Sequence, residues 1–429
     1  MTYPEAVDVL FSQLPMFQRQ GAAAYKADLS ATKRVCVALG HPERKLKFVH
    51  VAGTNGKGTV CHMVAAALQC AGHRVGLFTS PHLVDFRERI RVDGEMIPEA
   101  EVVEFVRRWQ EEGWGTPSFF ELTFGMALDH FVRSECDIVV LETGMGGRLD
   151  STNVVPTAEV CAITNIGLDH QQFLGPDIRS IAKEKAGILK NGVPVVLGSM
   201  RPEAQSEILA AALRSSSEMH FALERVRDMP SRAVGAESPV DAVNRATAFA
   251  LLEVLEAAGW ACSRSAMEEG LWNHAVHSGQ RGRWQVLSQP EQPRVVLDGG
   301  HNVDGVKLVV DKLNSMRQGG QLHVVWGAVA DKDHDAVLSL LPSDAVFHWC
   351  QADIPRALPA EKLQETAAQW GLAGGCFDRV EDAYRHALHV AQPEDVVWVG
   401  GSLFVVGNLL RDLDQKSPRN AEAGWKGGR

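Results

Sequence analysis

The chain has 429 residues, 45% of them hydrophobic, which is more than one ordinary core accommodates, so we expect two domains. Its formal net charge of −10 argues against nucleic acid as the main partner, because phosphate backbones are bound by basic surfaces. No apolar stretch approaches the roughly 20 residues that span a membrane, and the cysteines include no C-x-x-C pair that would suggest zinc or a disulfide framework.

The N-terminal stretch MTYPEAVDVLFSQLP lacks the basic and apolar regions of a signal peptide, which predicts a cytoplasmic enzyme. Between residues 46 and 200, short runs rich in Val and Ile alternate with helical patterns. These runs are KFVHVAG, HRVGLFTS, DIVVLETG, VCAITNIG and VPVVLG. Because strands buried on both faces read as continuous apolar runs, the pattern predicts a doubly wound parallel sheet. Further helices are expected over 203–222 and 241–258.

A second α/β series starts near residue 286, with strands expected at RVVLD, QLHVVWGA, AVFHWCQA and DVVWVGG. The Gly and Pro residues of GQRGRWQVLSQPEQP suit a link between domains. We therefore predict an α/β protein with a P-loop ATPase-like domain over 1–284 and a smaller Rossmann-like domain over 285–429. The polar, Gly-rich tail 416–429 is expected to be disordered.

The stretch HVAGTNGKGT, residues 50–59, joins a predicted strand to a predicted helix. Glycines at such a junction let the backbone approach a phosphate, and the helix N-terminus favours an anion. The spacing departs from the usual G-x-x-x-x-G-K-[ST] loop, yet a bland turn would not require a lysine between two glycines. We expect a nucleotide phosphate site formed by Gly53, Thr54, Asn55, Gly56, Lys57, Gly58 and Thr59.

Several motifs in the same order resemble those of the folylpolyglutamate synthase and bifunctional dihydrofolate synthase family, which belongs to the Mur-type amide ligases. They are HVAGTNGKGT, TSPH (79–82), LETGMGGRLDSTN (141–153), ITNIGLDH (163–170), EKAGI (184–188) and DGGHN (298–302). The resemblance implies an ATP-dependent ligase that joins L-glutamate to a pteroate or folyl carboxylate through an acyl phosphate. Its substrates would be dihydropteroate, reduced folates and L-glutamate; the alternative is folylpolyglutamate synthase activity alone.

Such chemistry brings two anions together, the γ-phosphate and the substrate carboxylate, so it needs a divalent metal and cationic side chains. An acyl phosphate also hydrolyses in water, which favours a cleft that closes between two domains. Glu142, Ser80 and His170 each follow a predicted strand, at the edge where open α/β sheets place their sites. By resemblance, Ser80 and Glu142 hold one Mg²⁺, and Glu142, His170 and a carbamylated Lys185 hold a second. Asp169 could orient His170, but an exposed aspartate beside the histidine is the expectation.

The carbamate on Lys185 is implied by the EKAGI motif alone. An ordinary lysine pKa of about 10.4 leaves about one amine in a thousand neutral at pH 7.4, so burial must lower it for CO₂ to react. Without the resemblance, the run AKEKAG reads as a helix surface. Lys183 falls on a roughly opposite helix face and is the natural control.

For the pterin, the resemblance points to two segments, SFFE and LDS. The first offers stacking rings and a carboxylate for an aminopyrimidine edge, although either phenylalanine could equally belong to the core. The second follows Glu142 in a Gly-rich loop. The expected pterin contacts are Ser118, Phe119, Phe120, Glu121, Leu149, Asp150 and Ser151.

ATP contacts are also expected beyond the phosphate loop: Asn244 at the adenine or α-phosphate, Arg283 at the phosphates and Asp298 at the ribose. His301 is expected to face the incoming glutamate or the transferred phosphate, so the expected catalytic residues are Lys57, His170, Lys185 and His301.

Two motifs depart from the family pattern. Gly300 and Val303 flank His301 and Asn302 where an alanine and a proline are common, and Arg281 replaces the proline of Pro-Gly-Arg-Phe. The second departure leaves open whether Arg281 or Arg283 contacts the phosphates.

Other functional classes fit less well. A small-molecule kinase has no need of the DGGHN domain, and an oxidoreductase would carry G-x-G-x-x-G after its first strand. A non-catalytic nucleotide-binding module would not require Glu142, His170 and Lys185 together. A peptidoglycan-precursor ligase usually has an extra N-terminal domain, whereas the phosphate loop here begins at His50. Folate preference, polyglutamate length, a monovalent cation and the oligomeric state stay open, with a monomer favoured.

Overall fold

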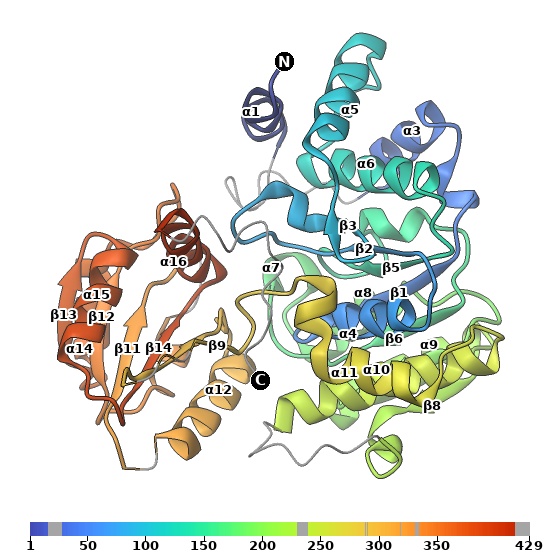
Figure 1. Cartoon of the computed structure of the whole chain (residues 1–429). Helices are drawn as coiled ribbons and strands as arrows, with labels where there is room; N and C mark the ends of the chain where they lie inside the picture. Colours follow the sequence, from blue (N-terminus) through green and yellow to red (C-terminus); the bar gives the residue numbers. More distant parts are fainter. Residues whose placement is uncertain are drawn as a thin grey trace. The chain divides into compact units, whose positions relative to one another are not determined.

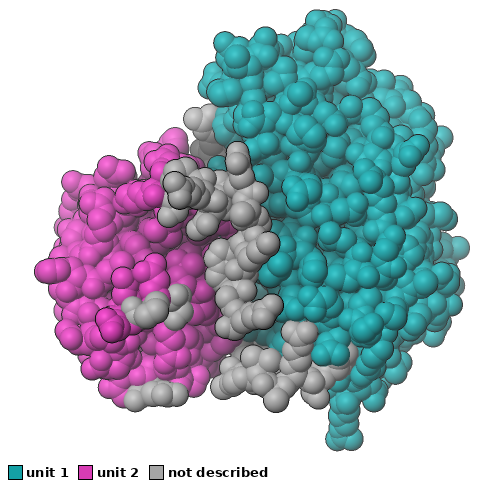
Figure 2. Space-filling model, viewed as in Figure 1, with its two compact units in different colours: residues 1–280 teal, residues 281–429 magenta. Residues whose placement is uncertain are grey.

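The computed structural model describes residues 1–15, 28–229, 239–287, 289, 291–317, 319–330 and 334–416. The chain divides into two compact units, Met1–Gln280 and Arg281–Arg429, which Figure 2 colours separately. The boundary expected from the sequence lies after Trp284 rather than after Gln280. Of the predicted tail, only Lys416 is described, as the last residue of helix α16 (Leu403–Lys416).

A mostly parallel sheet forms the centre of the first unit, and among the described residues its strand order is β4-β3-β2-β5-β1-β6-β7-β8 (Figure 1). The strands from β2 to β8 in this order pair in parallel, whereas β3 and β4 add an antiparallel edge. The strands are β1 (Phe48–Ala52), β2 (Val75–Phe78), β3 (Ile90–Val92), β4 (Glu95–Met96), β5 (Ile138–Glu142), β6 (Val160–Ile163), β7 (Val195–Leu197) and β8 (Met219–Phe221).

Helices cover both faces of this sheet, which confirms the predicted doubly wound architecture. Alternate side chains of a strand point to opposite faces, so Phe48 and Leu141 enter one core while Val49 and Val140 enter the other. The first core is closed by α1 (Tyr3–Gln13), α3 (Ser30–Ala38), α5 (Glu99–Glu112), α6 (Phe119–Arg133), α8 (Ile178–Ala186) and α9 (Pro202–Arg214). The second core is closed by α4 (Lys57–Cys70), α10 (Pro239–Ala257) and α11 (Arg264–Ser278).

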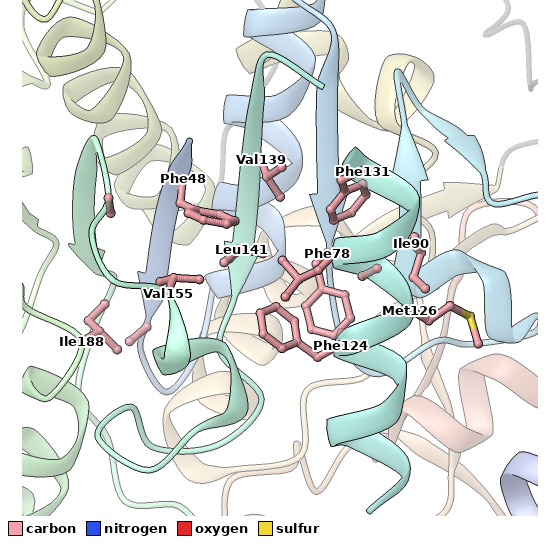
Figure 3. Close-up of a cluster of buried hydrophobic side chains, with 14 of the residues drawn as sticks. Phe48, Phe78, Ile90, Phe124, Met126, Phe131, Val139, Leu141, Val155 and Ile188 are labelled. Carbon is pink, nitrogen blue, oxygen red and sulfur yellow. The ribbon is translucent and has the colours of Figure 1, made fainter. Parts of the chain in front are cut away.

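Aromatic rings fix helix α6 on the sheet (Figure 3). Phe124 of α6 and Phe78 of β2 lie with ring centroids 5.4 Å apart. Phe131 occupies the space above Gly76, where a Cβ would lie only 2.9 Å from its ring. Because α6 is held in this way, the position of its N-terminal residues relative to the strand ends is fixed.

The pairing of the central strands brings three loops to one edge of the sheet. Val51 of β1 pairs with Glu142 of β5, and Ala52 pairs with Ile163 of β6. Since these strands are parallel, the loops that follow β1, β5 and β6 all leave at their carboxyl ends. This edge carries the residues that the sequence singles out.

The second unit is a smaller α/β layer with the strand order β13-β12-β11-β14-β10-β9 among the described residues. All neighbours are parallel except β9, which pairs antiparallel with β10. The strands are β9 (Gln285–Leu287), β10 (Arg294–Leu297), β11 (Leu322–Trp326), β12 (Val346–Cys350), β13 (Gly374–Phe377) and β14 (Val396–Gly400). Its helices besides α16 are α12 (Val303–Met316), α13 (Asp335–Leu338), α14 (Ala360–Ala368) and α15 (Val380–Val390).

The predicted helix over 203–222 is too long. Helix α9 ends at Arg214, Ser216 takes a left-handed φ of 50°, and residues 219–221 form β8. The predicted helix over 241–258 corresponds to α10. Among the described helices, none is long and apolar enough to cross a membrane.

Candidate active site

The phosphate loop lies between the end of β1 at Ala52 and the start of α4 at Lys57. Gly56, the residue before the helix, has a left-handed φ of 80°. A Cβ there would lie 2.2 Å from Asn244 Oδ1, so only glycine fits between the loop and helix α10. The loop thus ends on the N-terminus of α4, whose backbone N–H groups attract anions.

A second segment, after β6, holds the loop in place. The backbone N–H of Thr54 donates to Asn165 O at 3.0 Å, and that of Asn55 donates to Asn165 Oδ1 at 2.8 Å. Thr164 Oγ1 donates to Asn55 O at 2.7 Å, and Gly167 N–H donates to Thr54 Oγ1 at 3.0 Å. These supporting residues were not predicted as site residues, although ITNIG was among the motifs noted.

Two lysines converge on one carbonyl of the loop. Lys57 Nζ donates to Gly53 O at 3.0 Å and to Thr54 O at 3.2 Å, and Lys185 Nζ donates to the same Gly53 O at 2.6 Å. On the other side of the helix start, Thr59 Oγ1 accepts from Gln280 Nε2 at 3.2 Å. The loop therefore concentrates positive charge where a phosphate would approach.

Lys185 is buried in helix α8, with 4% of its surface exposed. Its pKa is lowered to about 7, mainly by burial and then by the charge of Lys57, while Asp169 and Asp150 act in the opposite direction. Lys183, two residues earlier, is 65% exposed and lies 3.9 Å from Glu207. The interpretation of AKEKAG as a helix surface is therefore correct for Lys183 and wrong for Lys185.

Glu142 ends β5 with a carboxylate that is 4% exposed. Its Oε2 accepts the backbone N–H of Ser80 at 2.8 Å. A Cβ on Gly58 would lie 3.4 Å from the same oxygen, so the first turn of α4 passes directly beside the carboxylate. The structure thus brings Glu142, Ser80 and the phosphate loop together.

His170 follows β6 in the left-handed region, with a φ of 52°, and precedes the short helix α7 (Gln171–Leu174). Its Nε2 lies 4.0 Å from Asp169 Oδ2, and its backbone N–H donates to Asp169 Oδ1 at 2.8 Å. The expectation that Asp169 is exposed is wrong, because its side chain is only 12% exposed and acts on Lys185. Within the described ranges, no group of three His, Cys, Asp or Glu side chains is arranged to hold a metal ion.

Glu121 closes a helix cap. Ser118 is the N-cap of α6, and its backbone N–H donates to Glu121 Oε2 at 2.6 Å, while Glu121 N–H donates back to Ser118 Oγ. Thr32 Oγ1 lies 3.4 Å from the other oxygen of Glu121. Both oxygens of this buried carboxylate are therefore engaged within the fold.

The two segments expected to contact pterin meet at Gly144. A Cβ on Gly144 would lie 2.7 Å from Phe120 Cζ and 3.2 Å from Asp150 Oδ2, so ring and carboxylate are neighbours. Phe119 instead enters the core, 3% exposed, against Phe86. Burial raises the pKa of Asp150, and hydrogen bonds from Thr152, Met145 and Gly144 oppose the rise. Leu149 is half-buried and Ser151 is buried.

In the second unit, Asp298 follows β10 and its carboxylate organises the turn. Oδ1 accepts from Gly300 N–H and Oδ2 from Trp284 N–H, both at 2.8 Å. His301 Nδ1 lies 3.0 Å from Gly299 O, at the start of α12.

The two arginines of the predicted link, Arg281 and Arg283, differ. Arg281 makes a two-pronged pair with Asp414 of α16, with both N–O distances 2.8 Å, whereas Arg283 is exposed.

Two family models match this chain. The family "Mur ligase middle domain" matches residues 51–197, and "Mur ligase, glutamate ligase domain" matches residues 282–403. The chain is 33% identical to the dihydrofolate synthase/folylpolyglutamate synthase of Escherichia coli, over 96% of this chain and 97% of that one.

Solved structures give the same result. E. coli FolC in complex with DHPP and ADP superposes with a TM-score of 0.83 at 30% identity, covering 97% of this chain and 98% of that one. The bifunctional folylpolyglutamate synthase/dihydrofolate synthase from Yersinia pestis, complexed with AMPPNP and Mn ion, has a TM-score of 0.79 at 30% identity, covering 96% and 98%.

Proposed function

This chain belongs to the Mur ligase family, among its dihydrofolate synthase/folylpolyglutamate synthase members, and we propose that it acts in both capacities. It joins L-glutamate to the carboxylate of dihydropteroate and of reduced folates, using ATP. The proposal rests on one observation: the phosphate loop with Lys57, Lys185 and Glu142 lie together at the carboxyl ends of the central strands.

The reaction has two steps. A carboxylate oxygen of the pterin substrate attacks the γ-phosphorus of ATP, the bond to the β,γ-bridging oxygen breaks, and ADP leaves. The amine of glutamate then attacks the acyl phosphate carbon, loses a proton, and phosphate departs as the amide forms. In both steps negative charge develops on oxygen atoms of the transition state. Fixed cations and backbone N–H groups stabilise that charge.

ATP binding is assigned to both units. In the first, the backbone of residues 53–59 and Lys57 receive the phosphates, with Thr59 at the helix start and Asn244 against Gly56. In the second, Arg283 and Asp298 contact the phosphates and the ribose. We assign pterin binding to the first unit and glutamate binding, with His301, to the second.

ATP and a divalent metal are the cofactors of this family, as the complexes of its members with ADP, AMPPNP and Mn indicate. The residues present fit such a metal: Glu142 is a buried carboxylate beside the first turn of α4, with the Ser80 backbone against it. We propose Mg²⁺ in two sites, the first at Ser80 and Glu142 and the second at Glu142, His170 and Lys185. The metal supplies charge neutralisation at the phosphate oxygens.

Lys185 can complete the second site only as an anion, and we propose that it carries a carbamate. Its amine is buried beside the phosphate loop, next to the Lys57 ammonium, where a second positive charge is unfavourable. The ammonium first loses a proton; the neutral amine then attacks CO₂, forming an N–C bond as one C=O π bond opens onto oxygen, and loses a second proton. A cation is thereby replaced by a carbamate whose single negative charge is shared by two oxygens.

The pterin ring is assigned to Phe120, Leu149, Asp150 and Ser151, around Gly144. Phe120 offers a partly exposed ring and Asp150 a carboxylate that can accept from an aminopyrimidine. Ser118, Phe119 and Glu121 act mainly by fixing the start of α6, through the cap and the core.

We propose that the protein works as a cytoplasmic monomer on small molecules, without nucleic acid or membrane partners. The net charge of −10 disfavours nucleic acid, and all eight cysteines are free thiols, as is usual in a reducing compartment. Light scattering is expected to give a mass near the 46.8 kDa of one chain.

Bifunctionality has a direct test. Purified protein is expected to release ADP and phosphate, in a glutamate-dependent way, both with dihydropteroate and with tetrahydrofolate. Activity with tetrahydrofolate alone would leave only the folylpolyglutamate synthase alternative. No glutamate-dependent ADP release with either substrate would overturn the proposed function.

In the predicted link between the domains, Arg283→Ala is expected to lower kcat/KM for ATP by at least about tenfold, or roughly 1.4 kcal/mol, because a phosphate-contacting charge is lost. Arg281→Ala should have a much smaller effect, since Arg281 is already paired with Asp414 in a half-exposed ion pair. Asp414→Ala is the matched control and should behave like Arg281→Ala. A larger loss in Arg281→Ala than in Arg283→Ala would reverse the assignment.

A further inference from the structure

A buried row of side chains joins strand β1 to the loop that carries Asp150. His50, in the middle of β1, is fully buried, and its Nε2 lies 2.8 Å from Thr152 Oγ1. Thr152 Oγ1 lies 2.5 Å from Asp150 Oδ1, which also accepts the Thr152 backbone N–H at 3.0 Å. His50 and Thr152 have no role in the functions assigned above.

The number of available protons determines which group donates and which accepts in each hydrogen bond between His50, Thr152 and Asp150. A threonine hydroxyl has one proton, and Asp150 Oδ1 accepts it. Thr152 Oγ1 must therefore accept from His50, which makes His50 the Nε2–H tautomer. The remaining nitrogen, Nδ1, is a buried atom without a hydrogen-bond partner in the part of the chain that is described. Burial lowers the pKa of His50 to about 3, so the ring stays neutral and the tautomer is stable.

Of the two oxygens of Asp150, Oδ2 is the one that protein donors use less fully. Oδ1 accepts two hydrogen bonds from Thr152, while Oδ2 accepts the Met145 N–H at 2.8 Å and lies on the side of Gly144 where Phe120 also lies. These donors occupy three of the roughly four acceptor positions of an ionised carboxylate, so Oδ2 can accept a ring donor in the fourth, in competition with the Gly144 N–H that also stabilises the carboxylate. The orientation of Oδ2 toward a ligand depends on the hydrogen bonds that hold Oδ1, because both oxygens belong to one rigid carboxylate.

We propose that His50 and Thr152 are positioning residues for pterin recognition: they orient the Asp150 carboxylate so that Oδ2 accepts from the aminopyrimidine of the substrate beside Phe120. The inference rests on the proposed function. It goes beyond it because neither residue touches the substrate and because β1, which leads into the phosphate loop, also becomes the anchor of the pterin loop.

A purely structural role predicts something different. His50 lies three residues before Gly53, so a general loosening of β1 would disturb the phosphate loop and raise KM for ATP. Positioning of Asp150 instead affects the pterin substrate alone. The two are separated by measuring KM for dihydropteroate, for ATP and for glutamate in the same variants.

The variants come in pairs. Thr152→Val removes the hydroxyl at nearly constant volume, and Thr152→Ser keeps it. His50→Leu removes the donor, and His50→Gln keeps an N–H at a similar reach. We expect Thr152→Val and His50→Leu to raise KM for dihydropteroate about tenfold or more, since a hydrogen bond chain to a charged group is broken. Thr152→Ser and His50→Gln should stay within about threefold of the wild type, and KM for ATP should be unchanged throughout.

His62 is the matched control: it is a buried histidine of the same unit whose Nδ1 lies 2.7 Å from the hydroxyl of Ser278, away from Asp150. His62→Leu is expected to lower thermal stability without changing KM for dihydropteroate. If His50→Leu does not fold, the Thr152 pair decides.

An unchanged KM for dihydropteroate in Thr152→Val, a parallel rise in KM for ATP, or an equal defect in Thr152→Ser would each overturn the inference. A wild-type protein without ligase activity would instead refute the proposed function.

Discussion

Substitution of Lys185 by alanine is expected to lower kcat by at least about a thousandfold, or roughly 4 kcal/mol of transition-state stabilisation, because a metal-facing anion beside the phosphate loop is lost. The fold should survive. Lys57 still donates to Gly53 O at 3.0 Å, and removing a buried amine carries no desolvation cost. Thermal melting and circular dichroism check the fold, and ADP release checks the rate.

Burial changes the chemistry that an ordinary lysine would show. With the pKa of Lys185 lowered to about 7, the neutral amine that reacts with CO₂ is no longer rare. At pH 7.4 an exposed lysine is neutral in only about one molecule in a thousand, so the lowered pKa makes the reactive form far more common. The carbamate should give a ¹³C signal when the protein is equilibrated with ¹³C-bicarbonate and Mg²⁺.

Lys183→Ala provides the control, because Lys183 lies on the same helix but is 65% exposed. It should retain nearly full activity. Added acetate or propionate should restore part of the turnover of Lys185→Ala by replacing the lost oxygens. A crystal grown with Mg²⁺ and bicarbonate that shows a bare ammonium at Lys185 would contradict the carbamate.

The sequence predicts well which residues lie at the carboxyl ends of β1, β5 and β6, because the motifs directly follow recognisable strands. The apolar runs that end at Ala52, Glu142 and Ile163 are long enough to be recognised, and parallel pairing then brings their ends together. Strands β3, β4, β8, β9 and β13 were not predicted, because each has at most four residues and lies at or next to a sheet edge. Except in β3, whose three residues are all buried, their side chains are half-buried or exposed, so no apolar run marks them.

Contacts within the site are harder to foresee. That Lys185 is buried was a missed signal, because it falls seven residues after Ile178 on the apolar face of α8, whereas Lys183 does not. The sequence does not encode which groups this buried amine meets. The support of Thr54 by Gly167 joins loops that are far apart in the chain and depends on β1 lying next to β6. Glu121 was a missed signal, since S-x-x-E at 118–121 is the pattern of a capping box.

Glu142→Gln is expected to lower kcat by about a hundredfold or more and to raise the Mg²⁺ concentration needed for half-maximal rate. The amide keeps the size of the side chain and an oxygen for the Ser80 N–H, so the loss isolates the negative charge. Arg89 is a buried arginine whose pKa is lowered to about 10 by burial, against the opposing charges of Glu142 and Glu88, so it loses a counter-charge as well. A modest fall in thermal stability should therefore accompany the loss of rate.

Glu121→Gln is the control for the metal requirement, because Glu121 and Glu142 are both carboxylates with 4% of their surface exposed. Glu121 is engaged in the cap of α6, so this substitution should cost about 1 kcal/mol of stability and leave the Mg²⁺ requirement unchanged. Titrations with Mg²⁺ and with Mn²⁺ at saturating ATP separate the two carboxylates. An unchanged metal requirement in Glu142→Gln, or an equal rise in Glu121→Gln, would remove Glu142 from the metal site and leave it with the structural task of holding the Ser80 backbone.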